Sequence, residues 1–336
     1  LSTLPPSHAY ELVAGQLAPL SAGARVVYAG ALLPNRLVET MRTQAVTRMI
    51  LVPALLQAIV REVVGTLADR GVLDQSCPSM TARELAAAVR ALDASERARI
   101  NAAIRDIIGP AFHVVTLGGA ASDPAWTDVL AFAGIDLDLG YGLTEAGPVV
   151  AMGRAADCPA GSVGRPLPGV NVRIGTDDEI LVQSPAAMTG YAADDRATAE
   201  AFADGWLRTG DRGRIDSDGF LFISGRIKEA MVTSAGETIY PDEIEPFYAS
   251  PLFAEFAVVP VQAADGNDEP TLVIVPADST PTDVLRREVA TLRAAAPARL
   301  RIAGFAHRRD ALPRSAAGKI RRRALADDIR LQERLS

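Results

Sequence analysis

Cysteine is scarce in this 336-residue sequence, and long apolar runs and an excess of basic residues are absent. The two cysteines, Cys77 and Cys158, are far apart and in no metal-ligand spacing, so we expect no disulfide framework and a cytoplasmic location. No apolar run reaches the roughly 18 residues of a transmembrane segment, so none is expected. A net charge of −7 lacks the basic surplus that binds phosphates, which argues against a nucleic-acid partner.

Lysine is rarer still. Of the 34 basic residues only Lys228 and Lys319 are lysines, in a chain rich in alanine and arginine. Under such a compositional bias, a lysine persists best where a compact ammonium on a flexible stem cannot be replaced by guanidinium. Chance survival at exposed positions is the alternative, and the neighbours of the two lysines decide between these readings below.

The first residues have neither the basic start nor the long apolar core of a signal peptide. The chain begins with Leu1, and the run at 1–6 reads as sequence from the middle of a domain. We therefore expect the N-terminus to lie inside a larger domain.

Short apolar strands alternate with helical stretches between residues 24 and 150. Thr81 followed by Glu84 predicts a capping box, and Gly109 predicts a helix end. The alternation indicates an α/β fold, part of a large doubly wound domain with a mainly parallel sheet, and ligands at the carboxyl ends of the strands. We predict strands at 25–30, 48–52 and 112–117 and helices at 35–42, 54–64 and 124–133.

The pattern of apolar and turn-forming residues changes near residue 160. Short strands broken by Gly, Pro and Asp predict a small β-rich subdomain, and a compact α+β unit follows Gly225. We predict three parts: 1–158, the N-terminally incomplete α/β part; 159–226, the β-rich subdomain; and 227–336, a compact C-terminal α+β domain. The expected strands are 170–174, 179–183, 206–208, 220–223, 254–261 and 271–275, and the expected helices are 241–249 and 282–294.

Seven short motifs follow one another along the chain. They are LPPSHAYE (4–11), GGA (118–120), YGLTEAGP (141–148), GSVGRPLPG (161–169), DGWLRTGDRGRID (204–216), GRIKEAMVTSAGETIYPDEIE (225–245) and LPRSAAGKIRR (312–322). In sequence and spacing they resemble the adenylate-forming ligase superfamily, which includes acyl-CoA synthetases, luciferases and the adenylation domains of peptide synthetases. Each motif alone is weak, but the ordered set spans essentially the whole chain.

The resemblance implies a two-step ligase that uses ATP, Mg²⁺ and CoA. A carboxylate attacks the α-phosphorus of ATP, giving an acyl-adenylate and pyrophosphate, and a thiol then attacks the adenylate carbonyl. Neither step needs a protein nucleophile, so the protein must align the reactants and neutralise charge.

The loop 141–145 supplies the phosphate and metal ligands in this family. By resemblance, Thr144 donates to a phosphate oxygen and Glu145 holds Mg²⁺, an ion that prefers oxygen ligands. A plain turn with an exposed glutamate is the alternative.

The adenine slot corresponds to the loop Gly118-Gly119-Ala120 with Tyr141 and Gly142, where a ring packs on one face of the base. A buried structural tyrosine would be common and is the alternative.

Asp211 matches the acid that accepts hydrogen bonds from both ribose hydroxyls, with Arg226 beside it. A lone Asp in a turn is usually only a turn residue, but Trp206, Thr209 and Gly210 surround it here.

Both lysines fall inside the motifs. By resemblance, Lys319 bridges the acid's carboxylate and the α-phosphate, and Lys228 is the hinge about which the C-terminal domain turns. A loop that contains Gly236 matches the channel for the thiol arm.

His8 matches a histidine beside the acyl pocket, and Gly119 lines the same pocket. A histidine at a helix start, bonded to the backbone, is the alternative for His8.

The motifs look most like fatty acyl-CoA synthetases, so the expected partners are a fatty acid, ATP and CoA. A fatty acyl-AMP ligase that delivers its product to an acyl carrier protein is the runner-up; because the run 211–228 has no inserted segment, we favour CoA.

Nothing in this sequence resembles the family's Ser/Thr/Gly-rich phosphate loop, which we expect before Leu1. An inactive fragment that serves as an interaction module is the alternative from a different class.

Overall fold

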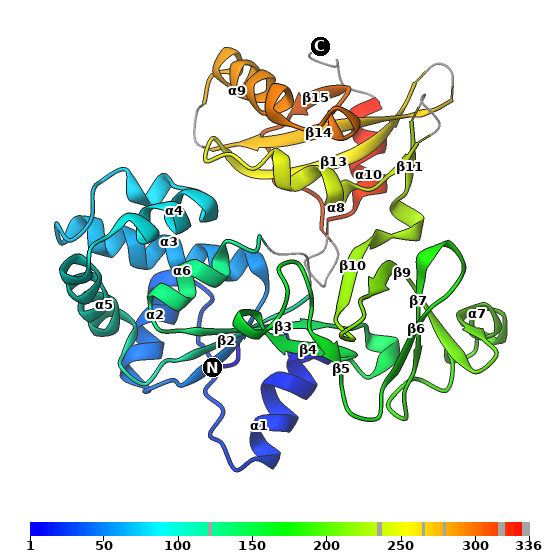
Figure 1. The fold of residues 1–336 in the computed structure, drawn as a ribbon, viewed down its shortest axis with the longest axis horizontal. Coiled ribbons are helices and arrows are strands. Elements are labelled where there is room, and N and C mark those ends of the chain that lie inside the picture. The colour runs from blue at the N-terminus through cyan, green and yellow to red at the C-terminus, as the bar shows by residue number, and fades with distance from the viewer. Residues whose placement is uncertain (120–122, 234–236, 264–265, 278–279, 315–319, 331–336) are drawn as a thin grey trace. The chain divides into compact units, whose positions relative to one another are not determined.

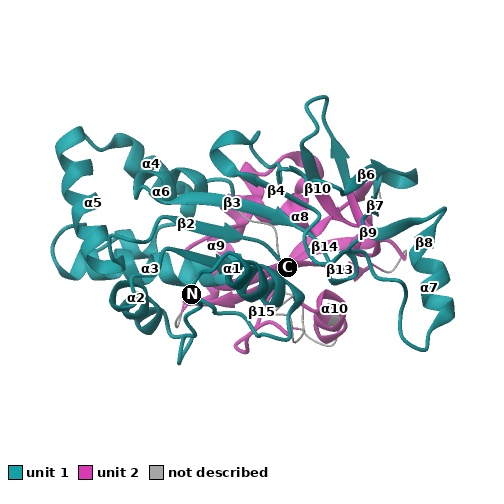
Figure 2. Cartoon of the chain, turned by 90° about the horizontal axis from the view of Figure 1, so that it is seen from below, with its two compact units in different colours: residues 1–209, 213–223 teal, residues 210–212, 224–336 magenta. Residues whose placement is uncertain are grey.

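The computed structural model describes residues 1–119, 123–233, 237–263, 266–277, 280–314 and 320–330. The chain forms two compact units (Figure 2). Unit 1 comprises Leu1–Thr209 and Gly213–Ile223, and unit 2 comprises Gly210–Arg212 and Ser224–Ser336. The expected α/β class is confirmed, since helices and mixed sheets build both units. The predicted division at 158 and 226 stays a prediction.

The first sheet of unit 1 is five-stranded, in the order β1-β2-β3-β4-β5 (Figure 1). The pairs β1–β2 and β2–β3 are parallel, and β4 and β5 complete the sheet in antiparallel fashion. The prediction of a mainly parallel arrangement therefore holds for the first three strands. The strands are β1 (Arg48–Leu51), β2 (Val114–Leu117), β3 (Asp136–Tyr141), β4 (Ala151–Arg154) and β5 (Arg165–Pro166).

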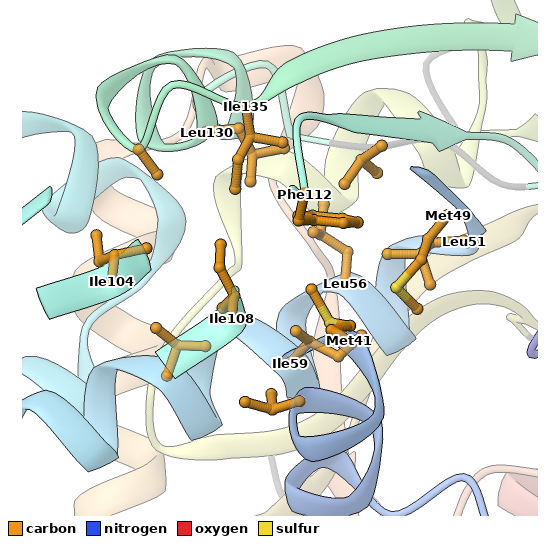
Figure 3. Close-up of a cluster of buried hydrophobic side chains, with 14 of the residues drawn as sticks. Met41, Met49, Leu51, Leu56, Ile59, Ile104, Ile108, Phe112, Leu130 and Ile135 are labelled. Carbon is orange, nitrogen blue, oxygen red and sulfur yellow. The ribbon is translucent and has the colours of Figure 1, made fainter. Parts of the chain in front are cut away.

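One hydrophobic core joins this sheet to the helices around it. Side chains of β1 and β2 point into it at alternate positions, because successive residues of a strand face opposite sides. Figure 3 shows part of this cluster, with labelled residues from β1 and from the surrounding helices. The helices of this region are α2 (Pro34–Thr43), α3 (Pro53–Asp69), α4 (Ala82–Ala91), α5 (Ala94–Ile108) and α6 (Trp126–Phe132).

Local sequence sets the helix ends. The capping box at Thr81 and Glu84 is confirmed, and Asp93 with Glu96 forms a second one that begins α5. Helix α5 ends at Gly109, as predicted. These caps satisfy backbone N–H groups that the first helical turn leaves unpaired.

The predicted strand at 25–30 is wrong. Within this stretch, only Tyr28 pairs in the part of the chain that the structure describes, through an isolated bridge to Ser2. The segment after Ser2 runs into Pro5 and Pro6, which have no N–H to continue a ladder. It leads instead into the π-helix Glu11–Leu17 and α1 (Ala18–Ser21).

The second sheet has the order β10-β9-β7-β6, with β8 beside β9. The predicted strand at 206–208 is much longer in the structure, because Gly210 and Gly213 continue the ladder instead of turning it. A Cβ at Gly213 would collide with the Phe222 carbonyl oxygen, so glycine allows the close pairing. The strands are β6 (Asn171–Ile174), β7 (Glu179–Gln183), β8 (Phe202–Ala203), β9 (Trp206–Ile215) and β10 (Leu221–Arg226), and α7 (Asp195–Ala201) precedes β8.

Unit 2 is built on the three-stranded sheet β13-β14-β15. One face packs on α8 and α9 and the other on α10, so alternate residues of β13 and β14 serve two separate cores. The predicted helix at 241–249 is shorter, because α8 passes into a 3₁₀ turn at Glu245–Phe247. The elements are β11 (Met231–Val232), β12 (Thr238–Ile239), α8 (Pro241–Ile244), β13 (Phe253–Gln262), β14 (Asp268–Pro276), α9 (Thr282–Ala295), β15 (Gly304–His307) and α10 (Arg322–Arg330).

Tyr248 fixes one of these cores. Its ring is fully buried, and its hydroxyl oxygen accepts a hydrogen bond from the Ile302 N–H at 3.0 Å. We expect Tyr248→Phe to lower the free energy of unfolding of unit 2 by about 1–3 kcal/mol, because it strands a buried N–H. Urea denaturation, monitored by amide hydrogen exchange in β14, measures this change in the free energy of unfolding. Tyr28→Phe, at an exposed tyrosine, should change it little, and equal effects would contradict the assignment.

Candidate active site

The carboxyl ends of β2 and β3 meet because the two strands are parallel and pair Leu117 with Leu139. Gly118 follows one strand directly and Gly140 lies near the end of the other. A Cβ at Gly118 would lie 3.4 Å from the Gly140 carbonyl oxygen. The predicted loops 118–120 and 141–145 therefore begin side by side in unit 1, although Ala120 lies outside the described residues.

Tyr10 covers this point from the N-terminal segment. Its hydroxyl donates to the Thr116 carbonyl at 3.2 Å, and a Cβ at Gly118 would lie 3.3 Å from its ring. Burial, followed by the charges of Glu11 and Asp138, raises the pKa of Tyr10 above its ordinary value, so the phenol stays protonated. Our sequence reasoning missed Tyr10, although it lies in the motif at 4–11.

Glu11 anchors the same motif. The carboxylate is fully buried and accepts hydrogen bonds from the Ser2 hydroxyl at 2.5 Å and from the Leu4 N–H at 3.2 Å. A buried carboxylate is tolerated only when it is hydrogen-bonded in this way. Glu11 thus ties the chain before His8 to the helix after it.

His8 lies beside these groups on the same segment. Its backbone N–H donates to the Pro5 carbonyl, but its ring Nδ1 is buried and has no hydrogen-bond partner among the residues that the structure describes. The alternative of a ring bonded to the backbone is thus not observed at this atom. Its assignment to the acyl pocket stays a prediction.

The loop after β3 carries Thr144 and Glu145, which differ in exposure. Thr144 begins a 3₁₀ turn and is exposed, while Glu145 is half-buried and accepts a hydrogen bond from the Tyr191 hydroxyl at 3.1 Å. The Glu145 carbonyl oxygen accepts from the Met188 N–H at 2.8 Å. The loop is therefore fixed by a neighbouring segment that our sequence reasoning did not single out.

Gly142 is required by close packing. A Cβ at this position would collide with the Pro148 carbonyl oxygen, so the loop can turn back on itself only with glycine there. Tyr141, at the end of β3, pairs with Ala151 of β4, and its carbonyl oxygen accepts from the Val150 N–H at 2.8 Å. Both ends of the loop are thus held by main-chain contacts.

Glu145 fits the metal that the resemblance implies. Mg²⁺ commonly takes one or two protein carboxylates and completes its shell with water and substrate phosphates. The described residues contain no group of three or more His, Cys, Asp or Glu that could hold a metal alone. A half-buried carboxylate next to an exposed threonine hydroxyl suits a metal held jointly with phosphates.

The two residues predicted to bind the ribose, Asp211 and Arg226, lie together in unit 2. Arg226 Nε donates to Asp211 Oδ1 at 3.0 Å, and Asp211 is 4% exposed whereas the Arg226 side chain is 45% exposed. A charge-assisted hydrogen bond of this kind fixes the orientation of the carboxylate. The pair joins residues of β9 and β10 that are fifteen positions apart in the sequence.

The hinge candidate follows this pair. Lys228 is exposed in the 3₁₀ turn Ile227–Glu229. Just before it, Gly225 has a φ of +142°, and a Cβ there would lie 3.1 Å from the Tyr240 ring, so glycine is needed. Lys319 and Gly236 lie outside the described residues.

A half-buried ionic cluster lies close to Lys319 in the sequence, and our sequence reasoning missed it. Arg322 begins α10 and forms ion pairs with Glu245 and Asp242, and with Glu229 at 3.1 Å. Burial raises the pKa of Glu245 and of Asp242, and Arg322 opposes both shifts. Burial also acts to lower the pKa of Arg322, but the three carboxylates outweigh it and keep the guanidinium charged.

We expect Arg322→Met to lower the free energy of unfolding of unit 2 by about 1–3 kcal/mol, because it leaves partly buried carboxylates unpaired. Denaturant titration measures this. Arg287→Met removes an exposed pair with Asp283 and should cost about 0–0.5 kcal/mol. Equal effects of the two variants would contradict a stabilising role of the Arg322 cluster.

Comparison with known proteins shows which family the chain belongs to. The family model described as AMP-binding enzyme matches residues 1–192. The chain belongs to this family. An acyl-CoA ligase of Purpureocillium lilacinum is 29% identical over 350 residues, covering 98% of this chain and 81% of the relative. A long-chain-fatty-acid–CoA ligase of Mycobacterium bovis is 39% identical over 157 residues, covering 46% of this chain and 26% of the relative.

Other relatives and structures have different named substrates. An indoleacetate–CoA ligase of Aromatoleum aromaticum is 39% identical over 210 residues, covering 59% of this chain and 40% of the relative. The o-succinylbenzoate CoA synthetase of Bacillus subtilis, solved with an acyl-adenylate, has a TM-score of 0.73 at 22% identity, covering 97% of this chain and 60% of that one. The chain thus spans less than half the length of several curated relatives.

None of its described helices is long and apolar enough to cross a membrane.

Proposed function

We propose that the protein carrying this chain activates a carboxylic acid with ATP and transfers the acyl group to CoA. The observation that carries this proposal is the fixed loop 141–145, where an exposed Thr144 hydroxyl adjoins the half-buried Glu145 carboxylate at the end of β3. Membership of the AMP-binding enzyme family supports it, as do relatives that are named CoA ligases.

In the first step, a carboxylate oxygen of the acid forms a bond to the α-phosphorus of ATP, and pyrophosphate leaves. Thr144 donates a hydrogen bond to a phosphate oxygen, while Glu145 holds Mg²⁺, which neutralises phosphate charge when bound. Asp211 accepts from the ribose hydroxyls and Lys319 reaches the acid's carboxylate and the α-phosphate. Charge neutralisation and alignment carry this step.

In the second step, the thiol sulfur of CoA attacks the acyl carbonyl carbon, and AMP leaves with the bonding electrons. Lys228 is the hinge about which the C-terminal part turns between the steps, and the loop with Gly236 lines the thiol's path. The hairpin between β9 and β10 turns tightly, with the Gly219 N–H donating to the Asp216 carbonyl at 3.0 Å. This absence of an insertion favours CoA over an acyl carrier protein as acceptor.

We propose a fatty acid as the substrate, since long-chain-fatty-acid–CoA ligases are among the relatives. Indoleacetate and succinylbenzoate ligases are also similar to the chain. Pyrophosphate exchange with fatty, aromatic and amino acids therefore decides the class. Exchange restricted to aromatic acids would overturn the fatty-acid assignment, and its absence with every acid would overturn the ligase proposal.

Lys319→Ala tests the division between the two steps. We expect it to abolish ATP–pyrophosphate exchange and to leave thiolation of a supplied acyl-adenylate largely intact, because the ammonium serves only the first step. Arg323→Ala, at an exposed arginine four residues later, should leave both reactions unchanged. Equal loss of both half-reactions in Lys319→Ala would rule out this role.

Asp211→Asn tests nucleotide binding. We expect the KM for ATP to rise about tenfold or more, because a neutral amide accepts hydrogen bonds from hydroxyls more weakly than a carboxylate. Steady-state kinetics with varied ATP measures this. Asp204→Asn, at an exposed aspartate with a positive φ that Asn also tolerates, should match the parent. An unchanged KM in Asp211→Asn would remove Asp211 from the site.

A further inference from the structure

A cavity of about 340 Å³ lies inside unit 1. Its sheet wall is made by Met49, Leu51 and Val115, and helices α3, α5 and α6 supply other walls. Figure 3 shows ten labelled side chains, all of which line this space. Protein interiors are close-packed, and an engineered apolar cavity of about 150 Å³ already binds small apolar molecules. A space of more than twice that size has room for a larger apolar ligand.

The lining is apolar except at one end. Its charged members are Asp74, Glu96 and Arg99, and all three are exposed, so they mark an opening to solvent. Cys77, a free and half-buried cysteine, lines the cavity as well. A hydrophobic interior with polar groups at one end accommodates an amphipathic molecule with its head outward.

The cavity is elongated along α3. Its lining includes Leu56 near the start of that helix and Leu67 near its end. Eleven residue steps at about 1.5 Å each correspond to roughly 16 Å. A space that reaches this far along one helix has room for an extended aliphatic chain.

The cavity is separate from the candidate active site. Met49 and Leu51 line it, whereas the Ile50 side chain between them points to the π-helix, within reach of a Cβ built on Gly15. Thr116 pairs with Ile50, so Gly118, two residues further, faces the same side as Ile50, where Tyr10 lies. Among the described residues, none of those placed in the candidate active site lines the cavity.

The opening carries one cation, Arg99, and two carboxylates, Asp74 and Glu96. Asp74 already accepts from the Ser76 N–H and hydroxyl, and Glu96 accepts from the Asp93 N–H, so both acids serve local turns. The Arg99 guanidinium donates to the Val72 carbonyl at 3.2 Å and forms no ion pair within the described ranges. Guanidinium has five N–H donors, which leaves capacity to bind a carboxylate.

We propose that this cavity is a second binding site, distinct from the site of adenylation, for one aliphatic chain with a carboxylate end. The chain lies along α3 between the sheet and α5, and the carboxylate binds the Arg99 guanidinium at the opening. Ligands of this class are free fatty acids. The site would bind them without activating them.

Cys77 is a natural reporter for the test. In the protein carrying this chain, with Cys158→Ala as background, the labelling rate of Cys77 by a thiol reagent is followed by mass spectrometry while dodecanoate is added. We expect saturating dodecanoate to slow the labelling several-fold, because the bound chain covers the thiol. Dodecanol and dodecyltrimethylammonium should protect about tenfold more weakly, since they cannot pair with Arg99.

Two variants locate the ligand. Val63→Phe fills the cavity from α3 and should abolish protection, while Arg99→Glu acts at the surface and should weaken it about tenfold or more, even if the filled variant fails to fold. Arg61→Glu changes an exposed arginine on α3 outside this cavity and should protect like the parent.

A non-hydrolysable dodecanoyl-adenylate analogue separates this site from the substrate site. We expect dodecanoate to protect Cys77 equally well when the analogue is saturating. Loss of protection with the analogue would make the cavity part of the substrate site and overturn the proposal. Labelling that dodecanoate never slows, or protection that persists in both Val63→Phe and Arg99→Glu, would overturn it as well.

Discussion

The parallel pairing of β1, β2 and β3 is the constraint on which the rest of unit 1 depends. Its register sets Leu51 beside Leu117 and Leu117 beside Leu139, so three loops leave the sheet at one edge. Because a strand alternates its faces, the same register sends Ile50 and Gly118 to one side and Met49 and Val115 to the other. A slip of one residue in β1 would put the apolar wall of the cavity on the side of Tyr10.

That alternation separates two chemical environments. On one side, Tyr10 and the buried Glu11 hold the N-terminal motif against main-chain groups of β2 and of its own turn. On the other side, the contacts are almost entirely apolar and leave a cavity between the helices. Buried polar side chains lie next to backbone carbonyls and N–H groups, because a buried polar atom needs a hydrogen-bond partner.

Unit 2 relies on charge as well as on apolar packing. Arg322, the last residue of the motif that contains Lys319, binds carboxylates from three neighbouring segments and so fixes the start of α10. The cluster is only partly buried, but removal of one member still destabilises unit 2 because the remaining charges lose their partner. It provides a fixed attachment for one end of the lysine motif in unit 2. Asp211 and Arg226 use the same kind of pairing, with one partner buried and the other exposed.

Local chemistry in the sequence determined the elements and the family. Strand–helix alternation, the capping box at Thr81 and the glycine after α5 were readable because they depend on neighbouring residues, and the ordered motifs identified the AMP-binding enzyme family. Only the tertiary structure decided that residues 25–30 form no strand, since strand formation depends on a partner elsewhere in the chain. It also decided that Tyr10 lies against Gly118, that Arg322 joins three carboxylates, and that a cavity lies along α3. Each depends on side chains distant in the sequence, whose meeting is set by packing and register and by no local pattern.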